Sequence, residues 1–152
     1  MKLPEPILDF INQKIKLRNY CLPHFYPTPE SFDKFQIGYR IDGNSGEKIT
    51  KEGPGEFHED WYVICSGYAD DPFFIDITEQ DHNYPVYFAW HGAGDWMPLL
   101  VADSITTFSA YLKLVKTIED SGADEQPEIA KHFDINEVFW QEVYNEYEKF
   151  EE

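Results

Sequence analysis

The sequence is poor in basic residues, and this scarcity limits what it can bind. Only 12 Lys and Arg stand against 29 Asp and Glu among its 152 residues, so the formal net charge is -17 at pH 7. Proteins that bind nucleic acids neutralise phosphates with Lys and Arg, and anionic membrane surfaces attract basic segments. We therefore expect neither nucleic acid nor a membrane as a partner.

Cysteine and long apolar runs are also scarce. Cys21 and Cys65 lie far apart and form no CxxC pattern. A disulfide framework needs denser cysteine, so we predict two free, buried thiols. No stretch approaches the ~18 apolar residues of a membrane span, and Pro4, Pro6 and Asp9 interrupt the apolar core that a signal peptide needs. These features favour a cytoplasmic protein.

Aromatic residues, by contrast, are plentiful, at 12 Phe, 10 Tyr and 4 Trp. Disordered acidic chains are poor in aromatics, and the length suits one domain, so we expect a single folded domain over residues 1–152. The acidity is uneven: residues 1–51 hold 8 basic and 6 acidic residues, whereas residues 52–152 hold 4 and 23. A surface of this charge favours a basic protein partner.

Apolar periodicity and turn-forming residues predict an α+β fold, in which helices pack on an antiparallel sheet. In the first part we expect a helix with Ile7, Leu8, Ile11 and Ile15 on its apolar stripe and a proline-aromatic loop over 18–31. A strand over 35–41 should follow, and the turn over 42–47 should form a hairpin between it and residues 48–51. Three central strands are expected over 61–66, 72–77 and 86–91.

Two helices are expected after the strands. Asp103 or Ser104 caps the first helix, and an acidic linker over 119–128 follows. A capping box at 134–137 starts the second helix, which runs towards Phe150 with Ile135, Val138, Val143 and Tyr147 inward. The predicted core includes Phe73, Ile75, Phe88, Phe108 and Leu112.

Two groups of polar residues are candidates for chemistry. His91, Asp95 and Trp96 surround a turn at Gly92 and Gly94, but the spacing specifies no nucleophile or second carboxylate. The alternative is that His91 bonds nearby backbone and that the glycines serve only the turn. The second group comprises Asp70, Asp71, Asp76, Glu79, Asp81 and His82.

Carboxylate oxygens suit Ca²⁺ or Mg²⁺, but the second group lacks the ligand pattern of an EF-hand, so a solvated acidic rim is favoured. Phosphate-binding glycine loops and a GxSxG sequence are absent as well. We therefore predict no metal, no cofactor and no enzymatic activity. A metal-dependent enzyme using His91 with Asp95, or the carboxylates of 70–82, remains a minor alternative.

Several short motifs follow one another in a fixed order between about residues 35 and 112. They are Gln36-Ile37-Gly38-Tyr39 with Gly43-Asn44-Ser45, Trp61-Tyr62-Val63-Ile64, Asp71-Pro72-Phe73-Phe74-Ile75-Asp76, Pro85-Val86-Tyr87-Phe88-Ala89, His91-Gly92 with Gly94, Trp96 and Pro98, and Ala102-Asp103-Ser104-Ile105 with Phe108 and Leu112. In order and spacing they resemble the SUKH superfamily, named in part for fungal regulators of cell-wall assembly. An acidic helical extension over about 119–152 lies outside the resemblance.

The resemblance implies a curved antiparallel sheet with flanking helices. It also implies a role, because many bacterial members look like immunity proteins that neutralise toxins, often nucleases. We therefore expect a non-enzymatic protein, a monomer or weak dimer, that binds a basic toxin domain through an acidic surface. The expected contacts are Asp70, Asp71, Glu79, Asp81, Asp95 and Trp96. The alternative is a regulatory scaffold that binds a cellular protein other than a toxin.

Overall fold

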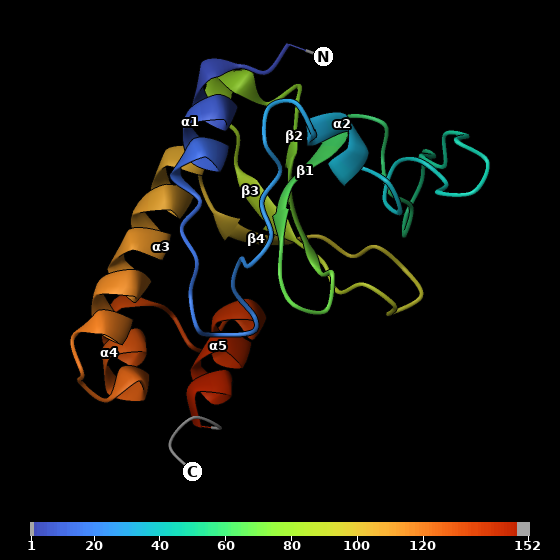
Figure 1. The fold of residues 1–152 in the computed structure, drawn as a ribbon. Helices are drawn as coiled ribbons and strands as arrows, with labels where there is room; N and C mark the ends of the chain where they lie inside the picture. The colour runs from blue at the N-terminus through green and yellow to red at the C-terminus, as the bar shows by residue number, and fades with distance from the viewer. Residues whose placement is uncertain (1, 149–152) are drawn as a thin grey trace.

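A four-stranded antiparallel sheet runs through the middle of the computed structural model, which describes residues 2–148 (Figure 1). Its strands, in spatial and chain order, are β1 (Trp61–Ser66), β2 (Pro72–Asp76), β3 (Val86–Phe88) and β4 (Leu99–Ala102). The register shifts between Val63 and Cys65 and again between Val86 and Tyr87. Such irregularities bend a strand and increase its twist. The predicted α+β fold with an antiparallel sheet is confirmed.

The long helices all lie on one side of the sheet (Figure 1). They are α1 (Glu5–Gln13), α3 (Ile105–Asp120), α4 (Glu125–His132) and α5 (Val138–Glu148). Ser104 is the cap of α3, and its side chain accepts a hydrogen bond from the backbone N–H of Thr107 at 3.0 Å. The N-cap is therefore Ser104 and not Asp103. The backbone of Ser104 is extended, which is the usual conformation of an N-cap residue.

The main core lies between the helices and the sheet. Every member of the predicted core set is at most 3% exposed. Aromatic rings join the layers: the Phe73 ring lies 5.3 Å from that of Phe108 on α3 and 5.7 Å from that of Phe139 on α5. Burial of rings of this size supplies much of a domain's hydrophobic stabilisation.

The opposite face of the sheet carries a second apolar cluster. It consists of Tyr39, Phe57, Trp61, Val63, Phe74 and Ala89, with Phe35, Tyr87 and Trp96 packed against it. The short helix α2 (Phe32–Phe35) and the chain that follows it lie on this side (Figure 1). Both faces of β2 are therefore buried, since Phe73 enters the first cluster and Phe74 the second.

Residues 35–41 are not the predicted strand. The chain forms α2 and then a turn, in which Tyr39 N–H donates to the Gln36 carbonyl at 3.1 Å. Only isolated bridges occur there, Ile37 with Ile41 and Ile41 with Lys48. The turn over 42–47 is present, closed by the Asp42 N–H on the Glu47 carbonyl at 2.8 Å. The predicted hairpin is wrong, because residues 48–51 form no strand and only the bridge between Ile41 and Lys48 joins the two sides.

The C-terminal part also departs from the prediction. The structure has a strand, β4, that was not predicted, and α4 begins at Glu125, inside the predicted linker. The predicted capping box is a turn before α5: the Asp134 side chain accepts from the N–H of Asn136, and Val138 is 52% exposed. Val143 and Tyr147 are buried as predicted, while Phe150 lies outside the described residues.

Candidate functional site

The turn between β1 and β2 brings two of the predicted carboxylates to one end of the sheet. Asp70 and Asp71 occupy this turn. Because β3 is antiparallel to β2, with Phe88 opposite Phe73, the chain that leaves β3 arrives at the same end. There the His91 N–H donates to the Asp71 carboxylate at 2.6 Å. Partial burial raises the pKa of Asp71, and the hydrogen bond from His91 opposes that rise.

Tyr39 connects this turn with the loop after β3. Its hydroxyl donates to the Asp70 carbonyl at 2.6 Å, and its ring lies 5.9 Å from that of Trp96 and 6.3 Å from that of His91. Burial raises the pKa of Tyr39 well above 10, and the carboxylates of Asp70 and Asp71 act in the same direction. The hydroxyl therefore stays protonated and keeps its role as a donor.

Asp95 and Trp96 are held in this region by a glycine. The Trp96 N–H donates to the Gly55 carbonyl at 2.9 Å. A Cβ on Gly55 would lie 2.9 Å from Oδ1 of Asp95, and the residue has φ +79°, which favours glycine. Tyr39 thus contacts Asp70 and Trp96, Asp71 joins the same region through His91, and Asp95 lies beside Gly55.

The other two predicted contacts lie elsewhere. Glu79 and Asp81 follow β2, whereas Asp70 and Asp71 precede it. Five strand residues at about 3.3 Å each separate the two ends by about 16 Å. Glu79 accepts a hydrogen bond from the Tyr87 hydroxyl at 2.9 Å, and Asp81 is exposed in the short helix η1 (Gln80–His82). The six residues therefore form two separate acidic regions.

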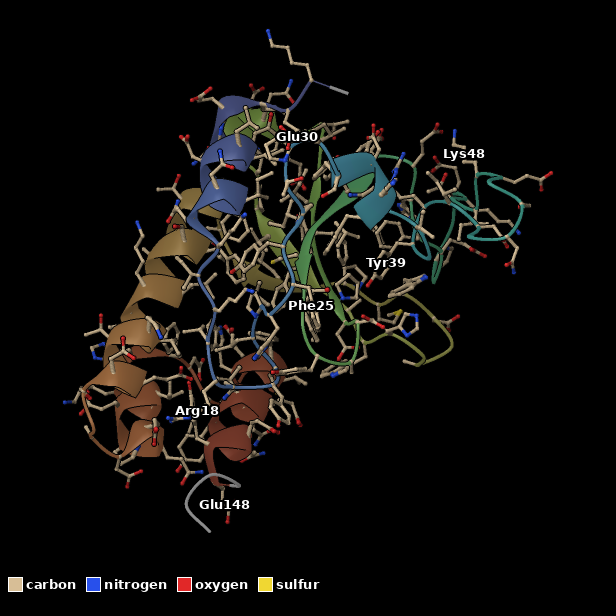
Figure 2. All side chains as sticks on the ribbon, viewed as in Figure 1. Arg18, Phe25, Glu30, Tyr39, Lys48 and Glu148 are labelled. Carbon is tan, nitrogen blue, oxygen red and sulfur yellow. The ribbon has the colours of Figure 1, made fainter. Side chains whose placement is uncertain are left out.

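An open pocket of about 450 Å³ lies beside the β1–β2 turn. Figure 2 shows that two of its side chains come from different segments, Phe25 from the chain beside β1 and Tyr39 from the chain that follows α2. The lining residues are Phe25, Lys34, Phe35, Ile37, Gly38, Tyr39, Ser66, Asp70 and His91. The pocket therefore combines aromatic rings with one acidic and one basic residue, Asp70 and Lys34.

Exposed apolar side chains line the pocket at Phe25 and Ile37 and continue from Phe25 to Tyr68 and Tyr20. Tyr20, Phe25, Ile37 and Tyr68, here called the apolar rim, are each between 46% and 55% exposed. The ring of Tyr68 lies 4.6 Å from that of Tyr20 and 6.0 Å from that of Phe25. Large exposed apolar groups beside polar ones are typical of protein interfaces.

The sequence interpretation missed the apolar rim. The proline-aromatic composition of 18–31 was its only signal, and that loop was expected to wrap the core. Phe25 instead joins the edge of β1, where it and Ser66 exchange backbone hydrogen bonds of 3.0 Å in both directions. This pairing holds the ring at the surface.

Within 2–148 no group of three or more His, Cys, Asp and Glu side chains is placed to hold a metal ion. Neither Cys21 nor Cys65 is in a disulfide, and burial raises the pKa of the Cys65 thiol; Cys21 is half-buried. None of the described helices combines the length and apolar character needed to cross a membrane.

Comparison with known proteins gives one match. A family model described as the SMI1 / KNR4 family (SUKH-1) matches residues 1–110. No curated protein and no solved structure matches the chain. The matched stretch includes the whole sheet and every residue that lines the pocket, whereas α4 and α5 follow it. Because the match covers well over half of the sequence, this protein belongs to the SMI1 / KNR4 family (SUKH-1).

Proposed function

We propose that this protein is a non-enzymatic immunity-type domain that binds a basic toxin domain, of the nuclease class, and blocks its active face. The observation that carries the proposal is the apolar rim beside Asp70 and the pocket, on a chain of net charge -17. Membership of the family supports it, because many bacterial SUKH proteins resemble immunity proteins.

The two properties of this surface have different roles in binding. The net negative charge attracts a basic partner over distances up to the Debye length, about 8 Å at physiological salt, and so raises the association rate. Aromatic side chains such as Tyr68 and Phe25 then supply the contacts that keep the complex together, since Tyr and Trp dominate interface hot spots. An active face that binds nucleic acid is basic, so an acidic domain seated on it excludes the substrate.

Binding without chemistry fits the roles of the polar groups near the pocket. The carboxylate of Asp71 accepts from the His91 N–H, and the hydroxyl of Tyr39 donates to the Asp70 carbonyl. These groups stabilise the turn and the loop. In this proposal they form the support of a docking surface.

Affinity capture from the source organism tests the proposal. The bound proteins are washed at low and then moderate salt, identified, and assayed for nuclease activity with and without this protein. One basic nuclease domain that survives the moderate wash and is inhibited at a one-to-one ratio would support the immunity role. Several endogenous proteins lost together at moderate salt would contradict it and favour the regulatory scaffold.

A further inference from the structure

The pocket beside the β1–β2 turn has the chemistry of a site for a planar cation. Rings from four segments line it: Phe25 from the chain beside β1, Phe35 from α2, Tyr39 from the turn after α2, and His91 from the loop after β3. Aromatic faces attract cations, and a guanidinium also stacks on them. The described part of the chain already contains one such contact, with the Arg40 guanidinium 3.8 Å from the centre of the Tyr62 ring.

Asp70 completes the site with a carboxylate at the edge of the pocket. Its backbone is left-handed, with φ +61°, a conformation that is uncommon outside glycine. Two hydrogen bonds hold it there: Asp70 N–H donates to the Gly67 carbonyl at 3.2 Å, and the Tyr39 hydroxyl donates to the Asp70 carbonyl at 2.6 Å.

The side chain of Asp70 is available for a ligand. It is exposed, and between residues 2 and 148 no hydrogen bond or ion pair engages its carboxylate. The neighbouring Asp71 differs, because its carboxylate is taken by the His91 N–H. One acid therefore supports the turn, and the other faces solvent beside the rings.

We propose that this pocket binds an arginine side chain of the partner protein, with the guanidinium among the rings and paired with the Asp70 carboxylate. Arginine suits it better than lysine, because its planar group both stacks on rings and forms two parallel hydrogen bonds with a carboxylate. The inference deepens the proposed function by naming the residue that the surface recognises, and it rests on that function for the identity of the partner.

A second copy of this chain is a poor source of that arginine. The sequence contains only Arg18 and Arg40. Arg18 forms an ion pair with Glu125, and Arg40 donates to the carbonyls of Glu59 and Trp61. Two chains of charge -17 also repel each other. The arginine must therefore come from a different, basic protein.

Lys34 allows a second test of the proposal, in which a substitution should strengthen cation binding. It lines the same pocket and carries the same charge as the ligand. Its removal should strengthen binding of a cation, whereas removal of the Asp70 charge should weaken it. Both substitutions replace a charged side chain with an uncharged one in the same pocket. A general loss of fold would weaken binding in both variants and would not produce opposite effects.

The experiment uses Nα-acetyl-arginine amide as the probe and its citrulline analogue, which has the same shape without the charge. Backbone amide NMR shifts are recorded on the full chain. We expect saturable shifts at Gly38, Asp70 and His91 with the arginine probe and none with citrulline. Asp70→Asn should weaken the apparent affinity about threefold and Lys34→Gln should strengthen it by a similar factor, as for partly exposed charge pairs.

Asp81→Asn is the matched control, because it removes the same charge from an exposed acid at the other end of β2. Asparagine tolerates left-handed backbone as aspartate does, so Asp70→Asn should remain folded. Equal shifts with the two probes, shifts spread over the acidic surface, or equal losses in Asp70→Asn and Asp81→Asn would overturn the proposal. Binding of the arginine probe without capture of a toxin domain would support the arginine site and contradict the proposed function. Capture of a toxin domain without binding of the arginine probe would support the proposed function and contradict the arginine site.

Discussion

The side-chain amide of Gln36 pairs with both backbone hydrogen-bonding groups of Val63. Its Nε2 donates to the Val63 carbonyl at 2.9 Å, and the Val63 N–H donates to its Oε1 at 2.9 Å. Gln36 is only 2% exposed, and Nε2 also donates to the carbonyl of Phe32 at 3.1 Å. One side chain thus replaces a neighbouring strand on the open edge of β1, and it fixes α2 and the pocket wall to the sheet.

Gln36→Leu should destabilise the fold. The substitution leaves the N–H and C=O of Val63 buried without partners, which costs about 2–4 kcal/mol for the pair. Urea unfolding would measure the loss in the free energy of unfolding. The exposed Gln141→Leu on α5 is the control and should change that free energy by less than about 0.5 kcal/mol. Equal values for the two variants would mean that the Gln36 pairing contributes nothing.

Glu119 should be important for attaching the C-terminal helices. Its carboxylate accepts from the N–H groups of Arg18 and Asn19 at 2.8 and 3.2 Å and from the Tyr147 hydroxyl at 2.7 Å. We expect Glu119→Ala to lower the free energy of unfolding by about 2–3 kcal/mol, because it leaves several donors without this acceptor. Increased hydrogen exchange in α5 would accompany the loss. Protection equal to that of the unmodified chain would show that packing alone holds α5.

Buried tyrosines should make the fold sensitive to alkaline pH. Burial raises the pKa of Tyr26, Tyr39 and Tyr147 above the ordinary value of 10, and the bond to Glu119 adds to the shift of Tyr147. Above pH 10 the unfolded chain therefore binds fewer protons than the folded chain, so stability falls as pH rises. The expected slope is about 1.4 kcal/mol per pH unit for each tyrosine.

Denaturant unfolding between pH 9 and 12 would measure that slope, and Tyr147→Phe should reduce it by about one tyrosine's share. Absorbance of tyrosinate follows the ionisation directly. A folded protein whose tyrosines all ionise without loss of stability would contradict the burial described here.

Phe73 and Tyr68 should separate folding from binding. Phe73 is fully buried between the sheet and the helices, so Phe73→Ala should cost about 3–5 kcal/mol of stability. Tyr68 is 53% exposed in the proposed docking surface, so Tyr68→Ala should change stability little and weaken partner binding about tenfold or more. Thermal unfolding and binding titrations would measure the two effects. If Phe73→Ala leaves the stability nearly unchanged, Phe73 is not part of the core.

Charge reversal should distinguish the two acidic regions. Asp70→Lys at the pocket should slow association with the captured partner and weaken the dependence of its rate on salt. Asp81→Lys makes the same charge change near the other end of β2 and should slow association less. Stopped-flow association at two salt concentrations measures both effects. If Asp81→Lys slows association more than Asp70→Lys, the docking surface lies around Glu79 and Asp81.

Local sequence patterns predicted the elements whose burial follows a simple period. The strand over 61–66 was predicted with the bounds it has, because a continuous apolar run ends at Gly67. The helix after Ser104 was predicted for a similar reason, since Ile105, Phe108, Leu112 and Val115 share one buried face. β4 was missed because its four residues give too short a run to distinguish a strand from a turn.

The α+β class, the antiparallel sheet, the main core and the acidity can be read from the amino-acid order, because each follows from composition or from the spacing of neighbouring residues. The surface that carries the candidate site depends instead on how distant segments of the chain pack together. One pocket is lined by residues from four separate segments, namely Phe25, Tyr39, Asp70 and His91. They meet because the end of β1, the start of β2 and the end of β3 lie at one end of the sheet, and Phe25 pairs with Ser66 at the end of β1. Glu79 lies apart from Asp70 because the two residues are at opposite ends of β2, so the length of the strand separates them.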